Sequence, residues 1–326
     1  MGRADFPSTM RAVLFDGELR FTADYPTPEL RPGWAMIKVK YAGICKTDME
    51  ILKGYAGFNG VLGHEFIGVV EYCDKPDWTG RRVTGEINLA CGRCEWCAKG
   101  LGRHCPNRTV LGIQGHDGCM ADYCVLPVTN LIEIPESVSD DRAVLIEPLA
   151  AACEILEQIA FDGSERVVVL GDGRLGTLCA WAISTKVQDI TMIGHHKDKL
   201  NMASWGHLKT VMNISDVEPG ADVVVDATGS AAGMKDAMSL CRPRGTIVLK
   251  STVALQGDLN LAPVVVKEIS VVGSRCGRFE DGLGMIESYR DMPLERLITA
   301  RYPIEEALEA FSRATRHDAM KVLLVM

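Results

Sequence analysis

The sequence lacks any apolar run of the roughly 18 residues that a membrane-spanning helix needs. It also lacks an excess of positive charge, since 35 lysines and arginines stand against 43 aspartates and glutamates in 326 residues. The resulting net charge of −8 argues against binding to nucleic-acid phosphates. The first six residues, MGRADF, lack the apolar stretch of a secretory signal. We therefore expect a cytoplasmic protein that binds neither membranes nor nucleic acids.

Two different patterns of apolar residues divide the chain. The first 130 or so residues, with alternation over 35–42 and β-branched residues over 66–71, are typical of β-strands. Farther along, short apolar strands alternate with helical stretches such as 140–158 and 231–240, as in parallel βαβ units; the strands are expected at 166–170, 190–193, 223–226, 246–250 and 269–273. We predict an α/β protein with a β-rich domain over 1–149, a doubly wound domain over 150–275, and a C-terminal segment, 276–326, that returns to the first domain.

Four of the twelve cysteines lie within fifteen residues, in the pattern Cys-x2-Cys-x2-Cys-x7-Cys formed by Cys91, Cys94, Cys97 and Cys105. Four thiolates complete a tetrahedral zinc shell and leave no open position for a substrate. The spacing therefore predicts a structural zinc ion. Free or redox-active cysteines are the alternative.

A more dispersed set of metal-ligand residue types comprises Cys45, His64, Glu65 and Glu147. Each is weak evidence alone, because a lone cysteine is more often a core residue and a lone glutamate is more often solvated. Taken together, a cysteine, a histidine and a carboxylate with room for water have the composition of a catalytic zinc site.

A glycine-rich turn follows the apolar strand 167–170. Its three glycines, Gly171, Gly173 and Gly176, form GxGxxG, with Arg174 and Leu175 between the last two. In the strand–turn–helix context predicted here, this pattern indicates a dinucleotide site, in which the helix start holds a pyrophosphate.

The end of the next strand indicates which dinucleotide is preferred. A carboxylate expected there would bind the adenosine ribose, but the residues are Gly194, His195, His196 and Lys197. A small residue followed by potential cations favours the 2′-phosphate of NADP over NAD. A solvated charge cluster, with Asp198 as ribose partner, is the alternative. Changing Gly194 to aspartate is accordingly predicted to shift the preference toward NAD.

Five features together resemble the zinc-containing medium-chain dehydrogenase/reductase family, the group of alcohol, sorbitol and threonine dehydrogenases. They are GICKTD at 43–48, GHEFIGVV at 63–70, the four-cysteine lobe, EPLA at 147–150 and the GxGxxG turn. They stand in the family's order and cover nearly the whole chain. The resemblance implies a GroES-like catalytic domain, a Rossmann domain for the nicotinamide coenzyme, and a homodimer or homotetramer.

The resemblance also implies roles for single residues of the first domain. Cys45, His64 and Glu147 match the ligands of the catalytic zinc, with Glu65 as a ligand or near neighbour. Asp48 matches the carboxylate that orients the zinc histidine, Thr47 the hydroxyl that relays the substrate proton, and Lys46 a pyrophosphate contact. Glu50 stands where many members have a histidine; either it takes the proton or it is a solvated surface acid.

Other matches lie on the coenzyme side. Thr228 matches the turn beside the adenosine, and Ser274 and Arg275 match the segment beside the nicotinamide. Lys321 matches a basic contact to the diphosphate, with a solvated surface lysine as the alternative.

The activity that the resemblance implies is hydride transfer between an alcohol or polyol, or the matching aldehyde or ketone, and NAD(P), with two zinc ions per chain. Zinc would acidify the bound alcohol and Thr47 would pass on its proton. One alternative is a protein that binds NADP or structural zinc without catalysis, but the set of Cys45, Thr47, His64 and Glu147 argues against it. A zinc-lobe nucleic-acid binder conflicts with the net charge. The sequence does not identify the substrate.

Overall fold

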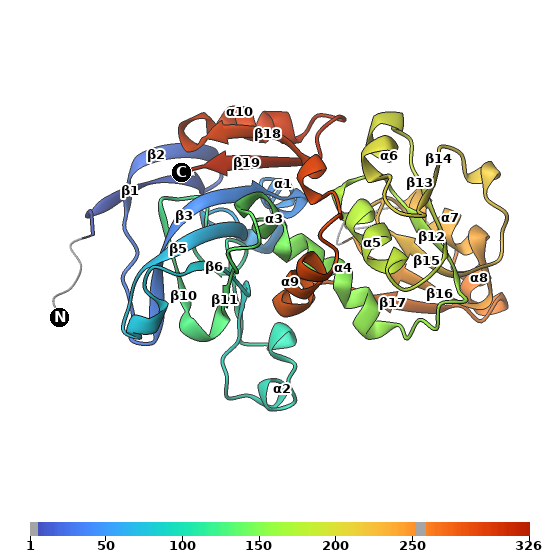
Figure 1. Cartoon of the computed structure of the whole chain (residues 1–326), viewed down its shortest axis with the longest axis horizontal. Helices are drawn as coiled ribbons and strands as arrows, with labels where there is room; N and C mark the ends of the chain where they lie inside the picture. The colour runs from blue at the N-terminus through green and yellow to red at the C-terminus, as the bar shows by residue number, and fades with distance from the viewer. Residues whose placement is uncertain (1–5, 252–258) are drawn as a thin grey trace. The chain divides into compact units, whose positions relative to one another are not determined.

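The computed structural model describes residues 6–251 and 259–326 and divides the chain into two compact units (Figure 1). Unit 1 comprises residues 1–147 and 298–326, and unit 2 comprises residues 148–297. Residues 1–5, on which the predicted lack of a secretory signal rests, lie outside the described residues. The C-terminal return to unit 1 begins at Ile298, later than the predicted 276. Residues 276–297 group with unit 2, where the Met285 sulfur lies 3.8 Å from the Cys153 thiol.

Unit 1 is rich in β-structure, as predicted. Its helices are α1 (Lys46–Ile51), α2 (Glu95–Ala98), α3 (Asp140–Ala143) and α10 (Ala307–Ala314). Its strands are β1 (Thr9–Phe15), β2 (Leu19–Pro26), β3 (Trp34–Ile44), β4 (Gly60–Val61), β5 (Glu65–Cys73), β6 (Arg82–Gly85), β7 (Asn88–Leu89), β8 (Thr109–Leu111), β9 (Gly115–His116), β10 (Tyr123–Pro127), β11 (Leu131–Glu133), β18 (Ile298–Pro303) and β19 (Lys321–Val325).

The largest sheet of unit 1 has the order β11-β6-β5-β3-β19-β18, with β10 also paired to β3. Strand β3 shows why these residues form a half-buried strand: Ile37 and Val39 are buried, whereas Lys38 and Lys40 are exposed. The C-terminal strand β19 pairs antiparallel with β3 between Val322 and Ile44. Strands β3 and β5 are adjacent in this sheet. The predicted site residues just after β3 (Cys45) and just before β5 (His64) are therefore neighbours.

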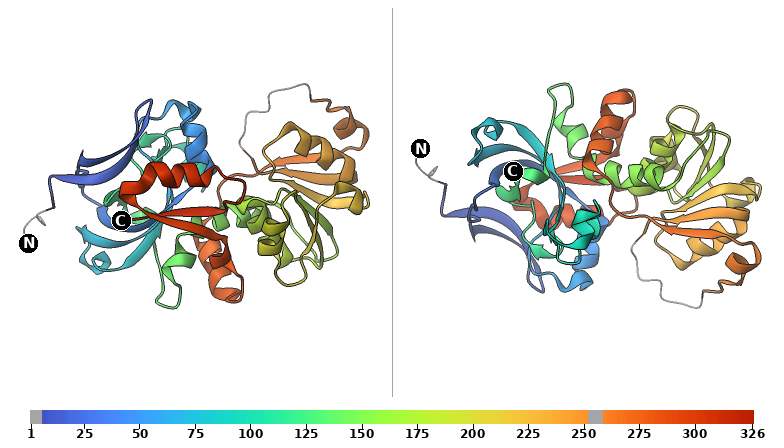
Figure 2. Two further views of the ribbon diagram at one scale, coloured as in Figure 1. Left: turned by 90° about the horizontal axis from the view of Figure 1, so that it is seen from above. Right: turned by 90° about the horizontal axis from the view of Figure 1, so that it is seen from below.

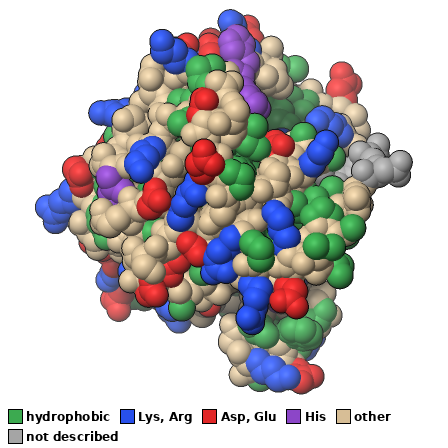
Figure 3. All heavy atoms as spheres, turned by 90° about the vertical axis from the view of Figure 1, so that its right-hand side faces the viewer, with side chains coloured by type: hydrophobic (Ala, Val, Ile, Leu, Met, Phe, Trp, Pro, Cys, Tyr) green, Lys and Arg blue, Asp and Glu red, His purple; other side chains and the backbone are tan. Residues whose placement is uncertain are grey.

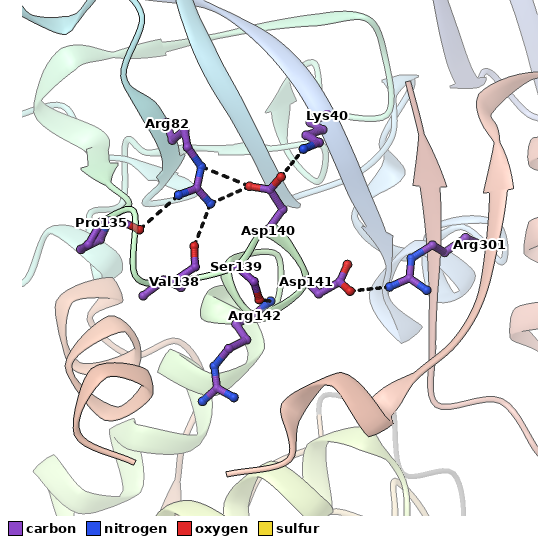
Figure 4. A network of polar contacts seen from close by, with 9 residues as sticks. All are labelled: Lys40, Arg82, Pro135, Val138, Ser139, Asp140, Asp141, Arg142 and Arg301. Carbon is purple, nitrogen blue, oxygen red and sulfur yellow. Dashed lines mark hydrogen bonds and ion pairs between the residues drawn. The ribbon is translucent and has the colours of Figure 1, made fainter. Parts of the chain in front are cut away.

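A network of ion pairs around the start of α3 links the C-terminal segment to other parts of unit 1 (Figure 4). Asp140, at the start of α3, accepts hydrogen bonds from Arg82 of β6 at 2.6 Å and pairs with Lys40 of β3. The next residue, Asp141, accepts a 2.6 Å hydrogen bond from Arg301 of β18. These contacts join three strands, β3, β6 and β18, to the start of α3. The two carboxylates also interact favourably with the positive end of the helix dipole.

The predicted helix 140–158 is two helices, α3 and α4 (Ile146–Gln158). The break has a physical cause in Pro148, which has no N–H to donate to the Val144 carbonyl and whose ring would collide with that carbonyl. Proline is tolerated in the first turn of a helix, which is where Pro148 stands in α4.

Unit 2 alternates strands and helices as predicted. After α4, its helices are α5 (Arg174–Ser184), α6 (Lys197–Ala203), α7 (Ala231–Leu240), α8 (Ala262–Val266) and α9 (Phe279–Ser288). Its strands are β12 (Arg166–Leu170), β13 (Asp189–Ile193), β14 (Lys209–Val211), β15 (Ala221–Asp226), β16 (Cys241–Leu249) and β17 (Ser270–Gly273).

These six strands form one parallel sheet of order β14-β13-β12-β15-β16-β17. Figure 2 shows α5 and α6 on one face of the sheet and α7 on the other. The order is that of a doubly wound dinucleotide-binding sheet, in which the strand order reverses beside β12, the first strand. The predicted fold class is therefore confirmed.

Among the described residues, no helix combines the length and the apolar character needed to cross a membrane.

Candidate active site and coenzyme-binding turn

The first element of the site is the short helix α1, which begins directly after Cys45. The backbone N–H of Cys45 donates to Asp48 Oδ2 at 2.7 Å, and the Asp48 N–H lies 3.2 Å from the Cys45 carbonyl oxygen. Asp48 therefore caps the helix on which it stands and fixes the backbone at Cys45. Its side chain is fully buried.

The other oxygen of Asp48 faces His64. Asp48 Oδ1 lies 3.4 Å from His64 Nδ1, and the His64 side chain is 3% exposed. Burial lowers the pKa of His64, but Asp48 and Cys45 raise it by more, so that its pKa lies well above the ordinary value. With Nδ1 toward the carboxylate, Nε2 is the ring atom left to bind a metal, which is the usual carboxylate–histidine–metal arrangement.

Glu65 begins β5 and is also fully buried. Its Oε2 forms an ion pair with Lys321 of β19, which is itself fully buried and donates to the Ile44 carbonyl at 3.1 Å. Lys321 is therefore not the solvated surface lysine that the sequence offered as one alternative. The other alternative, a contact to the coenzyme diphosphate, stays a prediction.

Gly63 explains how the chain places the two buried residues His64 and Glu65 at this point. Its backbone has a φ of 96°, which favours glycine, and a Cβ there would lie 3.0 Å from the Met120 backbone nitrogen. The chain therefore turns tightly just before His64, which lies beside the end of β3.

Three side chains of unit 1 converge on one point. Among the described residues, the potential ligand atoms of Cys45, His64 and Glu65 all lie within 4.8 Å of one another. Glu147, in the first turn of α4, is not a member of this group. A thiolate, an imidazole and a carboxylate at these separations have the donor types and spacing of a zinc site with room for a further ligand.

The predicted proton-relay residues lie on α1, next to this group. Thr47 Oγ1 lies 3.7 Å from Cys45 Sγ, and Thr47 is partly buried. Glu50 stands three residues on, on the same face of the helix, and forms a 3.0 Å ion pair with the exposed Lys53. Lys46 is exposed.

The four-cysteine lobe forms a second group of potential ligands around α2. The distances between sulfurs are 3.9 Å for Cys91–Cys97, 3.5 Å for Cys94–Cys97, 3.7 Å for Cys94–Cys105 and 3.5 Å for Cys105–Cys91. A zinc ion about 2.3 Å from each of four tetrahedral sulfurs places those sulfurs roughly 3.8 Å apart. The geometry of the lobe therefore fits a closed tetrahedral metal shell, whereas a disulfide would need sulfurs about 2.05 Å apart.

The electrostatics of the lobe also fit a cation. The backbone N–H of Arg93 lowers the pKa of Cys91 to about 6. Desolvation, together with hydrogen bonds to Cys94 and Cys105, raises the pKa of Cys97 to about 11. Neighbouring thiols thus cannot all ionise by themselves, and a dication among them would stabilise the remaining thiolates.

Asp48 offers a direct test of the carboxylate–histidine pair. Changing Asp48 to asparagine keeps the shape of the side chain but removes the charge that orients His64. We expect zinc affinity at the Cys45 site to fall by about 10- to 100-fold. Competition with a fluorescent chelator measures this affinity. Asp141→Asn, which disrupts an exposed ion pair of the same unit, should leave it unchanged, and equal affinities in both variants would contradict the role of Asp48.

In unit 2, the glycines of the β12–α5 turn are explained by the structure. Gly171 has a φ of 108°, and a Cβ on Gly176 would overlap the Gly171 carbonyl oxygen. A Cβ on Gly173, the N-cap of α5, would meet nothing within 4 Å. The first and third glycines are thus required by the turn itself, whereas the second borders open space at a helix N-terminus, where a pyrophosphate would be held.

Asp172, between the first two glycines, reaches the end of β13. Its Oδ2 accepts hydrogen bonds from the backbone N–H groups of His195 at 2.6 Å and His196 at 2.7 Å. The His196 Nδ1 lies 3.0 Å from the same oxygen. The predicted group of Gly194, His195, His196 and Lys197 therefore has a carboxylate beside it.

The remaining predicted coenzyme contacts follow β15 and β17. Thr228 donates its hydroxyl to Asp226 Oδ1 at 2.7 Å, which fixes the turn after β15. Buried Lys250, at the end of β16, donates to the Ser274 hydroxyl and the Arg275 carbonyl, both at 2.9 Å. The segment predicted to run beside the nicotinamide is thus held from within the sheet.

Comparisons with known proteins agree with this geometry. Residues 31–136 match the alcohol dehydrogenase GroES-like domain, and residues 140–326 match the glucose dehydrogenase C-terminus. A sorbitol dehydrogenase of Halalkalibacterium halodurans is 30% identical, over 91% of this chain and 93% of the relative. The chain belongs to the zinc-containing medium-chain dehydrogenase/reductase family.

Solved structures of two dehydrogenases share the fold along nearly the whole chain. An alcohol dehydrogenase of Escherichia coli in complex with NADH superposes with a TM-score of 0.88 at 25% identity, over 98% of this chain and all of the other. A zinc-binding dehydrogenase of Sinorhizobium meliloti bound to NADP superposes with a TM-score of 0.87, with the same identity and coverage. The GroES-like and Rossmann assignments are thereby confirmed.

Two residues of this dehydrogenase, Asp172 and Lys250, escaped interpretation from the sequence, and the burial of Lys321 was not predicted. Asp172 occupies a variable position of GxGxxG, Lys250 ends an apolar strand, and Lys321 precedes another. Lysine at a strand end is usually solvated, so the only available signal was that Lys250 and Lys321 each adjoin an unbroken apolar run.

Proposed function

We propose that this chain oxidises a secondary hydroxyl of a polyol, or reduces the matching ketose, by hydride transfer with a nicotinamide coenzyme. The observation that carries the proposal is the convergence of Cys45, His64 and Glu65, with His64 held by Asp48. The sorbitol dehydrogenase relative supports a polyol as the substrate class. The glycine-rich turn at the start of α5 supports the coenzyme.

We further propose two zinc ions per chain. The four cysteines would hold the structural ion, and Cys45, His64 and Glu147 the catalytic ion, with Glu65 as near neighbour or exchanging ligand. When bound, the catalytic zinc supplies a Lewis acid that makes the substrate hydroxyl more acidic. The ion pair of Glu65 Oε2 with Lys321 holds this carboxylate beside Cys45 and His64.

The chain's own residues then handle the proton. Thr47, beside Cys45, accepts the substrate proton at Oγ1 and passes its own toward solvent. Glu50 lies one turn farther along the same face of α1. Its carboxylate, which is also paired with Lys53, can receive that proton. Lys46, Thr228, Ser274 and Arg275 are proposed to position the coenzyme, together with the turn from Gly171 to Gly176, including Arg174 and Leu175.

The preference between NAD and NADP is not settled by the relatives, since one solved structure holds NADH and the other NADP. The sequence predicts NADP from Gly194, His195, His196 and Lys197. The position of Asp172 bears directly on that prediction.

We also propose a homodimer or homotetramer in the cytoplasm. In the part of the chain that the structure describes, β17 is the last strand of its sheet, and Val265 and Val266 of α8 are 77% and 82% exposed. On the face of unit 2 in Figure 3, hydrophobic side chains lie among charged ones. An open sheet edge beside exposed valines supports self-association there. Light scattering should give a mass of two or four chains, and a monomer would contradict this.

Initial rates over a substrate panel test the reaction. The panel contains sorbitol, xylitol, other polyols, simple alcohols and hydroxy amino acids, each with NAD and with NADP, and the absorbance of the reduced coenzyme is recorded. We expect the fastest rates with polyols. A polyol carrying deuterium at the reacting carbon should transfer that deuterium to the reduced coenzyme. Rates at background with every substrate, in a protein that binds one metal and no coenzyme, would favour the non-catalytic alternative.

A further inference from the structure

We propose that Asp172 is the carboxylate that selects the coenzyme, and that it makes this dehydrogenase prefer NAD over NADP. The inference rests on the proposed function, since it assumes that the β12–α5 turn binds a nicotinamide dinucleotide. It reverses the preference predicted from the residues after β13.

The sheet places Asp172 next to the end of β13. Strands β12 and β13 run parallel with Leu170 opposite Ile193, and the Gly171 N–H donates to the Ile193 carbonyl at 2.9 Å. Asp172, two residues after β12, and Gly194, directly after β13, are therefore neighbours at the carboxyl edge of the sheet. In dinucleotide-binding sheets this edge, at the end of the second strand, is where the adenosine ribose lies.

Asp172 occupies the volume that a side chain at the end of β13 would need. A Cβ on Gly194 would overlap the Cβ of Asp172 and lie 2.5 Å from its Oδ2. Only one of these two positions can therefore carry a carboxylate. The glycine at 194 does not signal a missing carboxylate, because it makes room for one that comes from the glycine-rich turn.

Asp172 also engages the groups that a 2′-phosphate would use. Its Oδ2 accepts the N–H groups of His195 and His196 and faces the His196 ring, and Asp172 is only 7% exposed. A dianionic 2′-phosphate would meet a buried negative charge and would have to displace it from these donors. The hydroxyls of an unphosphorylated ribose can instead donate to the carboxylate, which has lone pairs at Oδ1 beyond the contact with His196.

The same geometry explains why the single change Gly194→Asp is a poor test of preference. Its new side chain would collide with Asp172, so that any loss of binding could reflect the collision. The matched change is the double variant Asp172→Gly/Gly194→Asp, which moves the carboxylate from one strand end to the other.

Equilibrium binding of NAD and NADP to the zinc-loaded protein, measured by isothermal titration calorimetry, tests the inference without relying on activity. We expect the wild type to bind NAD at least about tenfold more tightly than NADP. Asp172→Ala should reduce that ratio by at least about tenfold, through weaker binding of NAD and tighter binding of NADP. The double variant should restore a preference for NAD.

Asp198→Ala tests the alternative ribose partner that the sequence offered, because Asp198 is an exposed acid in the first turn of α6, three residues after His195. It should leave the ratio unchanged. Asp172→Asn, which keeps the shape and removes the charge, replaces Asp172→Ala if circular dichroism shows that the alanine variant fails to fold. Tighter binding of NADP by the wild type, an unchanged ratio in both Asp172 variants, or an equal shift in Asp198→Ala would overturn the inference. Binding of neither coenzyme by the wild type would overturn the proposed function with it.

Discussion

Replacing His64 with alanine is expected to lower the rate of polyol oxidation by at least about a thousandfold and to remove one of the two zinc ions that we propose. The reason is that His64 is the one imidazole among the three converging side chains, and Asp48 holds it in place. Without His64 the proposed catalytic zinc would not be held, and the Lewis acid that it would supply, worth several kcal/mol in the transition state, would be lost. Zinc content by mass spectrometry and initial rates on the same preparation measure both effects.

The control for this variant is His317→Ala, which changes an exposed histidine of the same unit. It should keep both zinc ions and the wild-type rate. The four-cysteine ion should remain in His64→Ala as well, because it lies on a separate loop with its own four sulfurs. A His64→Ala protein that keeps two zinc ions, or that turns over at the wild-type rate, would show that the catalytic site has been placed wrongly.

Replacing Lys321 with methionine is expected to destabilise unit 1 by about 3–5 kcal/mol. Lys321 and Glu65 are both fully buried, and the methionine would leave the Glu65 carboxylate without its cationic partner. Hydrogen exchange of the β3 and β19 amides, followed by mass spectrometry on the zinc-loaded protein, reports the opening of unit 1 by itself.

Two further variants separate the ion pair from general effects of substitution. Replacing both Glu65 and Lys321 with methionine removes the pair without stranding a charge, so most of the lost stability should return. Lys40→Met breaks a pair whose lysine is 54% exposed, and should cost about 0–1 kcal/mol. Equal protection of the β3 and β19 amides in Lys321→Met and the wild type would contradict the account of this pair.

Much of the fold could be predicted from local sequence because the apolar runs coincide with strands. The predicted strand at 166–170 is β12, and the predicted helix at 231–240 is α7, with the same bounds. The error at 140–158 came from counting helical periodicity across Pro148, whose missing N–H ends α3. The late return at Ile298 was not predictable, because it depends on which unit the residues of α9 pack against.

The candidate site could be predicted where its residues form short sequence motifs. The four cysteines and the pair His64–Glu65 stand close together in sequence. The structure brings the four sulfurs together, and it groups Cys45 with His64 and Glu65 but not with Glu147. Lys321 and Asp172 were not predictable in this way. Lys321 pairs with a residue 256 positions away, and Asp172 binds amides 23 and 24 positions away, so that only the sheet register reveals their partners.

The central claim is that hydride transfer by this chain depends on zinc. The most direct measurement is the initial rate with the best polyol of the panel, before and after a chelator removes the metal, and again after zinc is returned. We expect the rate to fall at least about a hundredfold on chelation and to recover with zinc. A rate that is unaffected in a protein shown by mass spectrometry to be free of zinc would contradict the account.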